Sequence, residues 1–182
     1  MVGKIDAINA QGKNIILTGF MGTGKSAVGR ILARRLKRRL LDTDTLVELL
    51  TGMPIPVIFE RFGESYFRDR ESEVIAGLER HPAGTLVVAT GGGVVLREAN
   101  MASLEKHGLI VLLTASVDAI LQRTAKSDDR PLLRAPDARE RVTTLLQQRE
   151  PFYRRHHLAV DTTGKSPAAV ADQIMARLGM KN

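Results

Sequence analysis

A glycine-rich segment near the N-terminus constrains the fold of this chain more than any other feature. The apolar run from Asn14 to Thr18 predicts a strand, and the apolar spacing from Ala27 to Leu36 predicts a helix. Between them stands Gly19-Phe20-Met21-Gly22-Thr23-Gly24-Lys25-Ser26, which has the spacing of a phosphate-binding loop. A strand, this loop and a helix in that order predict an α/β unit that binds a polyphosphate.

The residue types of the loop suit a nucleoside triphosphate with its metal ion. Glycines let successive backbone N–H groups and the new helix N-terminus point at phosphate oxygens. Lys25 would reach the β- and γ-phosphates, and the Ser26 hydroxyl can ligate the Mg²⁺ that bridges them. The expected ATP contacts of this segment are Gly22, Thr23, Gly24, Lys25, Ser26 and Ala27.

Length and composition limit the architecture. A chain of 182 residues, 43% of them hydrophobic, is expected to form one domain over 1–182. It has no cysteine, which excludes disulfides and thiolate chemistry. The polar stretch 1–13 lacks the pattern of a signal peptide, and no apolar run approaches a membrane span, so we expect a cytoplasmic protein.

The net charge of +7 could indicate nucleic acid, an anionic membrane or small acidic ligands. The densest basic run, 34–39, falls at the end of the predicted first helix, where cations complement the helix dipole. Aromatic residues make up only 4% of the chain, too few to favour stacking on single-stranded nucleic acid. We therefore expect a nucleotide and a second small anion as partners, and neither nucleic acid nor a membrane.

Strand and helix patterns alternate along the whole chain. Expected strands are 14–18, 40–44, 85–89, 109–113 and 158–161. Expected helices are 27–36, 45–50, 54–62, 64–80, 97–107, 116–124, 138–155 and 167–178. This order predicts an open five-stranded parallel sheet with helices on both faces. The one long irregular stretch, 125–137, is of a length that is usually functional or disordered.

Three motifs follow predicted strands and should meet at the carboxyl edge of the sheet, namely the phosphate loop, Asp42 with Asp44, and Gly91-Gly92-Gly93. If the second strand persists through Asp44, the two acids point in opposite directions. One would then face Mg²⁺ and the phosphates, and the other an acceptor hydroxyl. Alternatively, one of them simply caps the following helix.

Several separated motifs together resemble the shikimate kinase family, over nearly the full length and in the family's order. They are the phosphate loop, Asp42-Thr43-Asp44, Gly63 to Arg68 with Glu71, Gly91 to Gly93, Arg130 to Leu133, and Arg149 to Tyr153. The resemblance implies a nucleoside-monophosphate-kinase-like fold with a substrate-binding region at about 42–80 and a mobile lid at about 125–137. It also implies transfer of the ATP γ-phosphate to the 3-hydroxyl of shikimate.

The resemblance assigns roles to individual residues. Shikimate would be bound by Asp44, Arg68, Gly91, Gly92, Gly93 and Arg149, and the two arginines suit its carboxylate because guanidinium binds carboxylates bidentately. Lys25, Asp44 and Arg130 would be catalytic. Ser26 and Asp42 would hold Mg²⁺, while Arg130 would cover the phosphates and Arg123 would pack on adenine.

Other readings of the same residues stay open. A kinase of this fold acting on gluconate or another hydroxy acid would use the same arginines, and a nucleoside monophosphate would also suit them. A non-catalytic nucleotide-binding regulator, or an RNA-associated protein using the basic end of the first helix, is the alternative from another class. We expect a monomer with ATP and shikimate as substrates, and a structural role for His156-His157, which lack further ligands nearby.

Overall fold

A single parallel sheet organises the molecule, whose computed structural model describes residues 10, 12–125 and 137–180. The strand order is β2-β3-β1-β4-β5, and every pairing is parallel. The strands are β1 (Asn14–Thr18), β2 (Arg39–Asp42), β3 (Leu86–Ala89), β4 (Gly108–Thr114) and β5 (Leu158–Asp161). The predicted fold class, an open parallel five-stranded α/β sheet, is confirmed.

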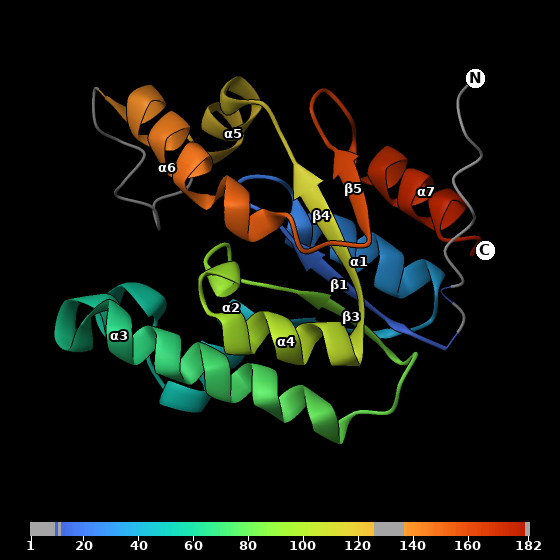
Figure 1. Cartoon of the computed structure of the whole chain (residues 1–182), viewed down its shortest axis with the longest axis horizontal. Helices are drawn as coiled ribbons and strands as arrows, with labels where there is room; N and C mark the ends of the chain where they lie inside the picture. The colour runs from blue at the N-terminus through green and yellow to red at the C-terminus, as the bar shows by residue number, and fades with distance from the viewer. Residues whose placement is uncertain (1–9, 11, 126–136, 181–182) are drawn as a thin grey trace.

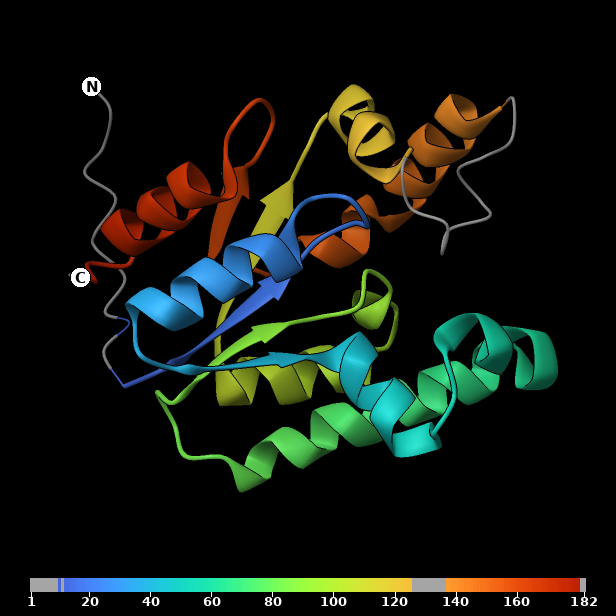
Figure 2. The ribbon, with the colours of Figure 1, turned by 180° about the vertical axis from the view of Figure 1, so that it is seen from behind.

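Helices cover both faces of this sheet. They are α1 (Lys25–Arg35), α2 (Thr43–Thr51), α3 (Ile55–Ala76), α4 (Glu98–His107), α5 (Val117–Thr124), α6 (Ala138–Tyr153) and α7 (Pro167–Arg177), with short 3₁₀ turns η1 (Gly77–Arg80) and η2 (Val94–Leu96). Helices α3 and α4 lie in front of the sheet in Figure 1. The opposite view shows α1 and α7 over the other face (Figure 2).

The central strands are apolar along their length because both of their faces are buried. Ile15 and Leu17 of β1 pack into a cluster with α1 and α7, whereas Ile16 between them packs into a cluster on the other face. All five residues of β1 are buried. This double burial explains why the sequence of such a strand shows an unbroken apolar run instead of an alternation.

A third, smaller cluster holds the region formed by α2 and α3. Val47 of α2 packs with Ile58 and Phe67 of α3, and all three side chains are buried. This helical pair and the pair α5–α6 lie on opposite sides of the carboxyl edge of the sheet, as both views show (Figures 1 and 2). Two separate bodies therefore flank the loop that follows β1.

That loop also lies at the point where the strand order reverses, while all strands stay parallel. The connection from β1 leads to β2 on one side of the sheet, and the connection from the neighbouring β4 leads to β5 on the other side. Ligands of open α/β sheets bind at such a reversal, beyond the carboxyl ends of the strands. The phosphate loop therefore lies at the position in the topology where open α/β sheets commonly bind ligands.

The predicted boundary between the second strand and its helix is wrong. The sequence suggests a strand through Asp44, but β2 ends at Asp42 and α2 begins at Thr43. The Asp42 side chain accepts a hydrogen bond from the backbone N–H of Asp44 at 3.2 Å, which is the geometry of a helix N-cap. The argument that the two acids alternate across a strand therefore fails, and the alternative, that one of them is a cap, is correct.

The helix boundaries after α2 also differ from those predicted. The predicted helices 54–62 and 64–80 form one helix, α3, with a kink at Gly63, where φ is 77° and ψ is 177°. A short 3₁₀ turn then replaces the end of the second predicted helix. Most of the expected lid, with Arg130, falls at 126–136 and lies outside the described residues.

Candidate active site

The phosphate loop is shaped by backbone conformations that favour glycine. Gly19 has φ 135°, and a Cβ there would collide with the backbone carbonyl of Leu113. Gly24 has φ 95° and directly precedes α1. These conformations turn the chain sharply from β1 into the helix, so that backbone N–H groups at the start of α1 face the region beyond the strand ends.

Lys25 lies against its own loop. Only 8% of the residue is exposed, and its Nζ donates to the carbonyls of Gly19 at 2.7 Å and Phe20 at 2.9 Å. These bonds hold the ammonium at the entrance of the loop. A single fixed cation at this place can offset the charge of bound phosphates.

Ser26 and Asp42 meet as the sequence predicts, although Asp42 is also the cap of α2. The Ser26 hydroxyl donates to Asp42 Oδ2 at 2.7 Å, while Asp42 Oδ1 accepts from the backbone of Asp44. Hydroxyl and carboxylate oxygens are hard ligands, and Mg²⁺ in phosphate-transfer sites takes one or two of them together with phosphates and water. This pair therefore fits the metal ion that the phosphate loop implies. The described part of the chain contains no cluster of three or more His, Cys, Asp or Glu side chains that could hold a metal ion.

Arg68 is oriented by two carboxylates on its own helix. Its Nη1 donates to Glu71 Oε2 at 2.9 Å, and its Nη2 and Nε donate to Glu64 Oε1 at 3.1 and 3.2 Å. Burial lowers the pKa of Arg68, but the charges and hydrogen bonds of Glu71 and Glu64 outweigh burial and raise it overall. The two carboxylates thus keep the Arg68 guanidinium charged and in one orientation.

Glu71 is the most deeply buried charged group of the site. Its side chain is 1% exposed, and its Oε1 has no hydrogen-bond partner among the described residues. Burial raises the pKa of this carboxyl, the positive charge of Arg68 lowers it, and the charge of Asp44 raises it further. Glu71 belongs to the motif that also contains Gly63 to Arg68, but the motif alone assigns it no role. The spacing of three residues from Arg68 on a predicted helix was the signal for this pair.

The three glycines at Gly91 to Gly93 allow these side chains to reach the sheet edge. A Cβ on Gly91 would lie 2.6 Å from Asp44 Oδ1 and 2.7 Å from Glu71 Oε1, and a Cβ on Gly93 would collide with the Arg68 guanidinium. A Cβ on Gly92 would approach the backbone nitrogen of Met21 at 3.2 Å. Side chains from α2 and α3 and the phosphate loop therefore converge on one short backbone segment.

Arg149 reaches the same segment from α6. Its Nη1 lies 3.5 Å from the carbonyl oxygen of Gly92, and its guanidinium carbon lies 5.4 Å from the centre of the Phe20 ring. Tyr153, one turn further along, donates from its hydroxyl to the same Gly92 oxygen at 2.7 Å. Tyr153 ends the motif Arg149 to Tyr153, but the motif alone assigns it no role.

Arg123 connects the phosphate loop to the segment after β5. Its Nη1 donates to the Gly22 carbonyl at 3.2 Å and to the Thr162 hydroxyl at 2.9 Å, and its Nη2 donates to the Thr162 carbonyl at 2.7 Å. The Arg123 guanidinium, which is expected to pack on adenine, therefore links the phosphate loop to Thr162 in this structure.

One cleft of about 800 Å³ brings most of the predicted residues together. Predicted residues that line it are Gly22, Gly24, Lys25, Ser26, Ala27, Asp42, Asp44, Arg68, Gly91, Gly92, Gly93, Arg123 and Arg149. Thr23 does not line it. Its side chain is buried, its hydroxyl donates to the Phe20 carbonyl at 2.8 Å, and it faces a second cavity. Only the backbone of Thr23 can therefore serve the phosphate site.

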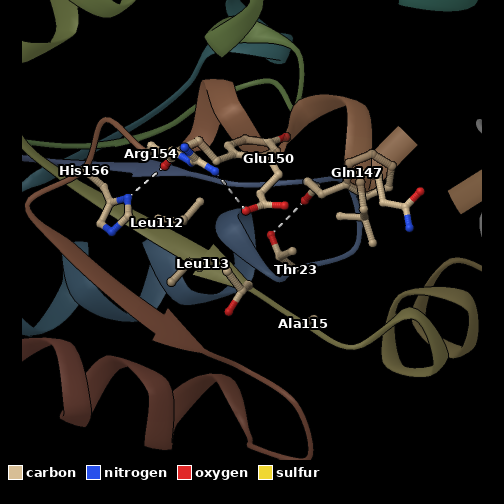
Figure 3. Close-up of a pocket in the computed structure, with 12 residues that line it drawn as sticks. Thr23, Leu112, Leu113, Ala115, Gln147, Glu150, Arg154 and His156 are labelled. Carbon is tan, nitrogen blue, oxygen red and sulfur yellow. Dashed lines mark hydrogen bonds and ion pairs between the residues drawn. The ribbon is translucent and has the colours of Figure 1, made fainter. Parts of the chain in front are cut away.

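The second cavity, of about 400 Å³, lies between the end of β4 and helix α6 (Figure 3). Leu112, Leu113 and Ala115 form part of its wall, and the ion-paired Glu150 and Arg154 lie along α6 (Figure 3). His156 also lines it and bonds through Nδ1 to the Tyr153 carbonyl oxygen. The neighbouring His157 accepts a bond from the Ile110 backbone, so both histidines contact the main chain, as a structural role requires.

The comparisons with known proteins agree with this geometry. The family model described as shikimate kinase matches residues 21–179. The chain belongs to the shikimate kinase family. It is 46% identical over 163 residues to the shikimate kinase of Thermodesulfovibrio yellowstonii, covering 90% of this chain and 93% of that one. It is 45% identical over 166 residues to that of Caldanaerobacter subterraneus, covering 90% of this chain and 94% of the relative.

A solved structure supports the fold of this shikimate kinase family member directly. The shikimate kinase from Acinetobacter baumannii in complex with shikimate is 39% identical, with a TM-score of 0.85. The match covers 91% of this chain and 92% of that one. None of the described helices is long and apolar enough to cross a membrane.

Proposed function

We propose that this chain is a shikimate kinase, which transfers the γ-phosphoryl group of ATP to the 3-hydroxyl of shikimate. The products are ADP and shikimate 3-phosphate, an intermediate on the route to chorismate and the aromatic amino acids. One observation carries the proposal: a single cleft holds a phosphate loop with Lys25 on one side and Arg68, Arg149 and Asp44 on the other. Membership of the shikimate kinase family supports the same substrate.

The phosphate side of the cleft binds ATP. Backbone N–H groups from Gly22 to Ala27 surround the β- and γ-phosphates, and Lys25 offsets charge on the moving phosphoryl group. Ser26 and Asp42 would hold Mg²⁺, which would neutralise part of the phosphate charge. Arg130, in the expected lid at about 125–137, would act on the phosphates, and Arg123 would contact the adenine.

The other side of the cleft binds the acid. Arg68 and Arg149 hold the carboxylate of shikimate through paired N–H donors, and Gly91 to Gly93 let the ring approach the backbone. Arg68 is already charged and oriented by Glu71, so less conformational entropy is lost when the acid binds.

Asp44 aligns the reacting hydroxyl. The 3-hydroxyl oxygen forms a bond to the γ-phosphorus while the bond between that phosphorus and the β,γ-bridging oxygen breaks. The hydroxyl proton passes to Asp44, and the leaving electrons stay on ADP. Because phosphoryl transfer passes through a loose transition state, the position of the hydroxyl matters more than the strength of the base.

The remaining expectations follow from this assignment. ATP and shikimate are small-molecule partners, and the protein acts as a monomer without nucleic acid or a membrane. Since ATP is the phosphoryl donor, we place the reaction in the cytoplasm.

A panel of acceptors tests the proposal. ADP release is measured with ATP and Mg²⁺ in the presence of shikimate, gluconate or a nucleoside monophosphate. We expect turnover with shikimate and none above background with the other two. Turnover with gluconate alone would identify a hydroxy-acid kinase of another specificity. ATP binding without turnover on any acceptor would indicate a nucleotide-binding regulator and refute the proposal.

A further inference from the structure

A buried tyrosine joins two parts of the cleft that are far apart in sequence. Tyr153 lies at the end of α6, is 8% exposed, and donates its hydroxyl to the Gly92 carbonyl 61 residues away. The bond length of 2.7 Å is typical of a well-formed hydroxyl hydrogen bond. A buried hydroxyl without a partner would cost free energy, so this contact specifies where α6 ends relative to the glycine segment.

Gly92 is the middle of the segment on which the acid-binding residues converge. Its neighbours Gly91 and Gly93 lie against Asp44, Glu71 and the guanidinium of Arg68 so closely that a methyl group would not fit. A small displacement of the Gly92 carbonyl would therefore change the distance from the backbone to all three side chains.

The Tyr153 ring lies between the apolar core and a cavity. Tyr153 lines the cavity of about 400 Å³ between β4 and α6, together with Leu112, Leu146 and Gln147. Tyr153 also belongs to the buried apolar cluster on this face of the sheet. Packing therefore holds the ring, and the hydroxyl bond adds a specific link from the ring to the Gly92 carbonyl.

Arg149 precedes Tyr153 by one helical turn and approaches the same carbonyl at 3.5 Å. The two side chains share one acceptor, so the tyrosine bond also sets the distance of Arg149 from Gly92. We propose that Tyr153 is a positioning residue for acid recognition: its hydroxyl holds the Gly92 carbonyl and so aligns Arg149 on α6 with the side chains that meet Gly91 and Gly93. This inference rests on the proposed function for the identity of the acid.

The test compares two tyrosine variants. Tyr153→Phe removes only the hydroxyl and leaves the ring. Tyr66→Phe makes the same chemical change at the other tyrosine of the chain, which stacks on Phe62 and whose hydroxyl donates no hydrogen bond to the described residues. Measurements are the KM and Kd for shikimate, kcat, the Kd for ATP, and the Tm.

A hydrogen bond of this kind contributes roughly a three- to tenfold change in an equilibrium constant. We expect Tyr153→Phe to raise the KM and Kd for shikimate by this factor, with the Kd for ATP within twofold of the wild type and a smaller effect on kcat. Tyr66→Phe should leave all four constants unchanged. A Tyr153→Phe protein with a lower Tm but an unchanged KM for shikimate would overturn the proposal, as would equal weakening of ATP and shikimate binding.

Amide hydrogen exchange separates this inference from the proposed function. The segment 91–96 of the free protein should exchange faster in Tyr153→Phe than in the wild type or in Tyr66→Phe, because Gly92 loses its anchor. If the wild type fails to bind shikimate while exchange in this segment is faster in Tyr153→Phe, the proposed function fails and the positioning role stands. Unchanged exchange in the segment would overturn the positioning role itself.

Discussion

The two walls of the cleft differ in the chemical groups that line them. The phosphate wall is mainly backbone: glycine conformations turn the loop between β1 and α1, and Lys25 is its one cationic side chain among the residues 19–26. The acid wall consists of charged side chains from three helices, with Arg68 paired to Glu71 and Arg149 arriving from α6. Backbone donors recognise any phosphate, whereas an arranged set of side chains can select one acid.

The walls also differ in the partners of their buried charged side chains. Lys25 is bonded to carbonyls of its own loop, which are neutral groups. On the acid wall, burial and the charge of Asp44 raise the pKa of Glu71 while Arg68 opposes them. The Glu71 carboxylate, whose Oε1 has no hydrogen-bond partner among the described residues, orients the Arg68 guanidinium, and removing either partner of such a buried pair is strongly destabilising.

The largest expected effect separates the walls by their ligands. Lys25→Ala should lower kcat on the order of 10²–10³-fold and weaken ATP binding, because it removes charge stabilisation at the transferring phosphoryl group. Asp44→Asn should also lower kcat strongly but leave the Kd for ATP within about twofold, because it affects only the alignment of the hydroxyl. Steady-state kinetics and nucleotide titrations measure both.

A wild-type kcat in Asp44→Asn would contradict this division between the walls, since Asp44 would then not act on the acceptor. An equal loss of ATP affinity in both variants would also contradict it. Circular dichroism provides the control that each variant is folded.

The next effect tests whether the acid wall recognises a carboxylate. Arg149→Lys keeps the charge but loses the planar pair of donors, so it should measurably weaken shikimate binding. Arg149→Ala should weaken binding by tens-fold or more, since truncating one member of a buried charge-assisted pair typically costs on the order of 2–5 kcal/mol. The Kd for ATP should barely change in either variant.

A substrate analogue supplies the matching control for Arg149. Shikimate with its carboxylate reduced to an alcohol should bind poorly to the wild type and lose little more affinity in Arg149→Ala. Fully additive losses would mean that Arg149 does not contact the carboxylate, and the acid wall would then need another anchor.

The same small substitution on each wall should give different defects. Gly19→Ala places a Cβ at φ 135° against the Leu113 carbonyl, a backbone atom that cannot move aside, so the Tm should fall by several degrees. Gly93→Ala meets the end of the Arg68 side chain, which can shift. We expect its Tm to change little and its KM for shikimate to rise several-fold, and the opposite pattern would contradict the distinction between the walls.

The sequence predicts the phosphate wall more fully than the acid wall, because the phosphate wall is formed by one local segment. A phosphate loop is local, so its spacing between a strand and a helix predicts its structure directly. The start of α2 was missed because an aspartate two residues before another reads equally as strand end or cap, and only the bond from the Asp44 N–H decides between them. Arg68 and Arg149 could be named only through motif resemblance, and the bond from Tyr153 to Gly92 depends on tertiary packing that no local pattern encodes.

The smallest expected effect concerns the tyrosine that fastens α6 to the acid wall. Burial raises the pKa of Tyr153 from its ordinary value of 10.0 to about 12. A group whose pKa is raised on folding stabilises the native state fully below the unfolded pKa and loses that contribution as pH rises through the folded one. The wild type should therefore lose about 1 kcal/mol of its free energy of unfolding relative to Tyr153→Phe between pH 9 and pH 11. Urea titrations of both proteins measure this difference, in which the effects of lysines and of Tyr66 cancel. A difference that stays constant across this range would show that the phenol titrates as it does in the unfolded chain. The hydroxyl would then not be held against Gly92, and the acid wall would be aligned by Arg68 and Glu71 without help from α6.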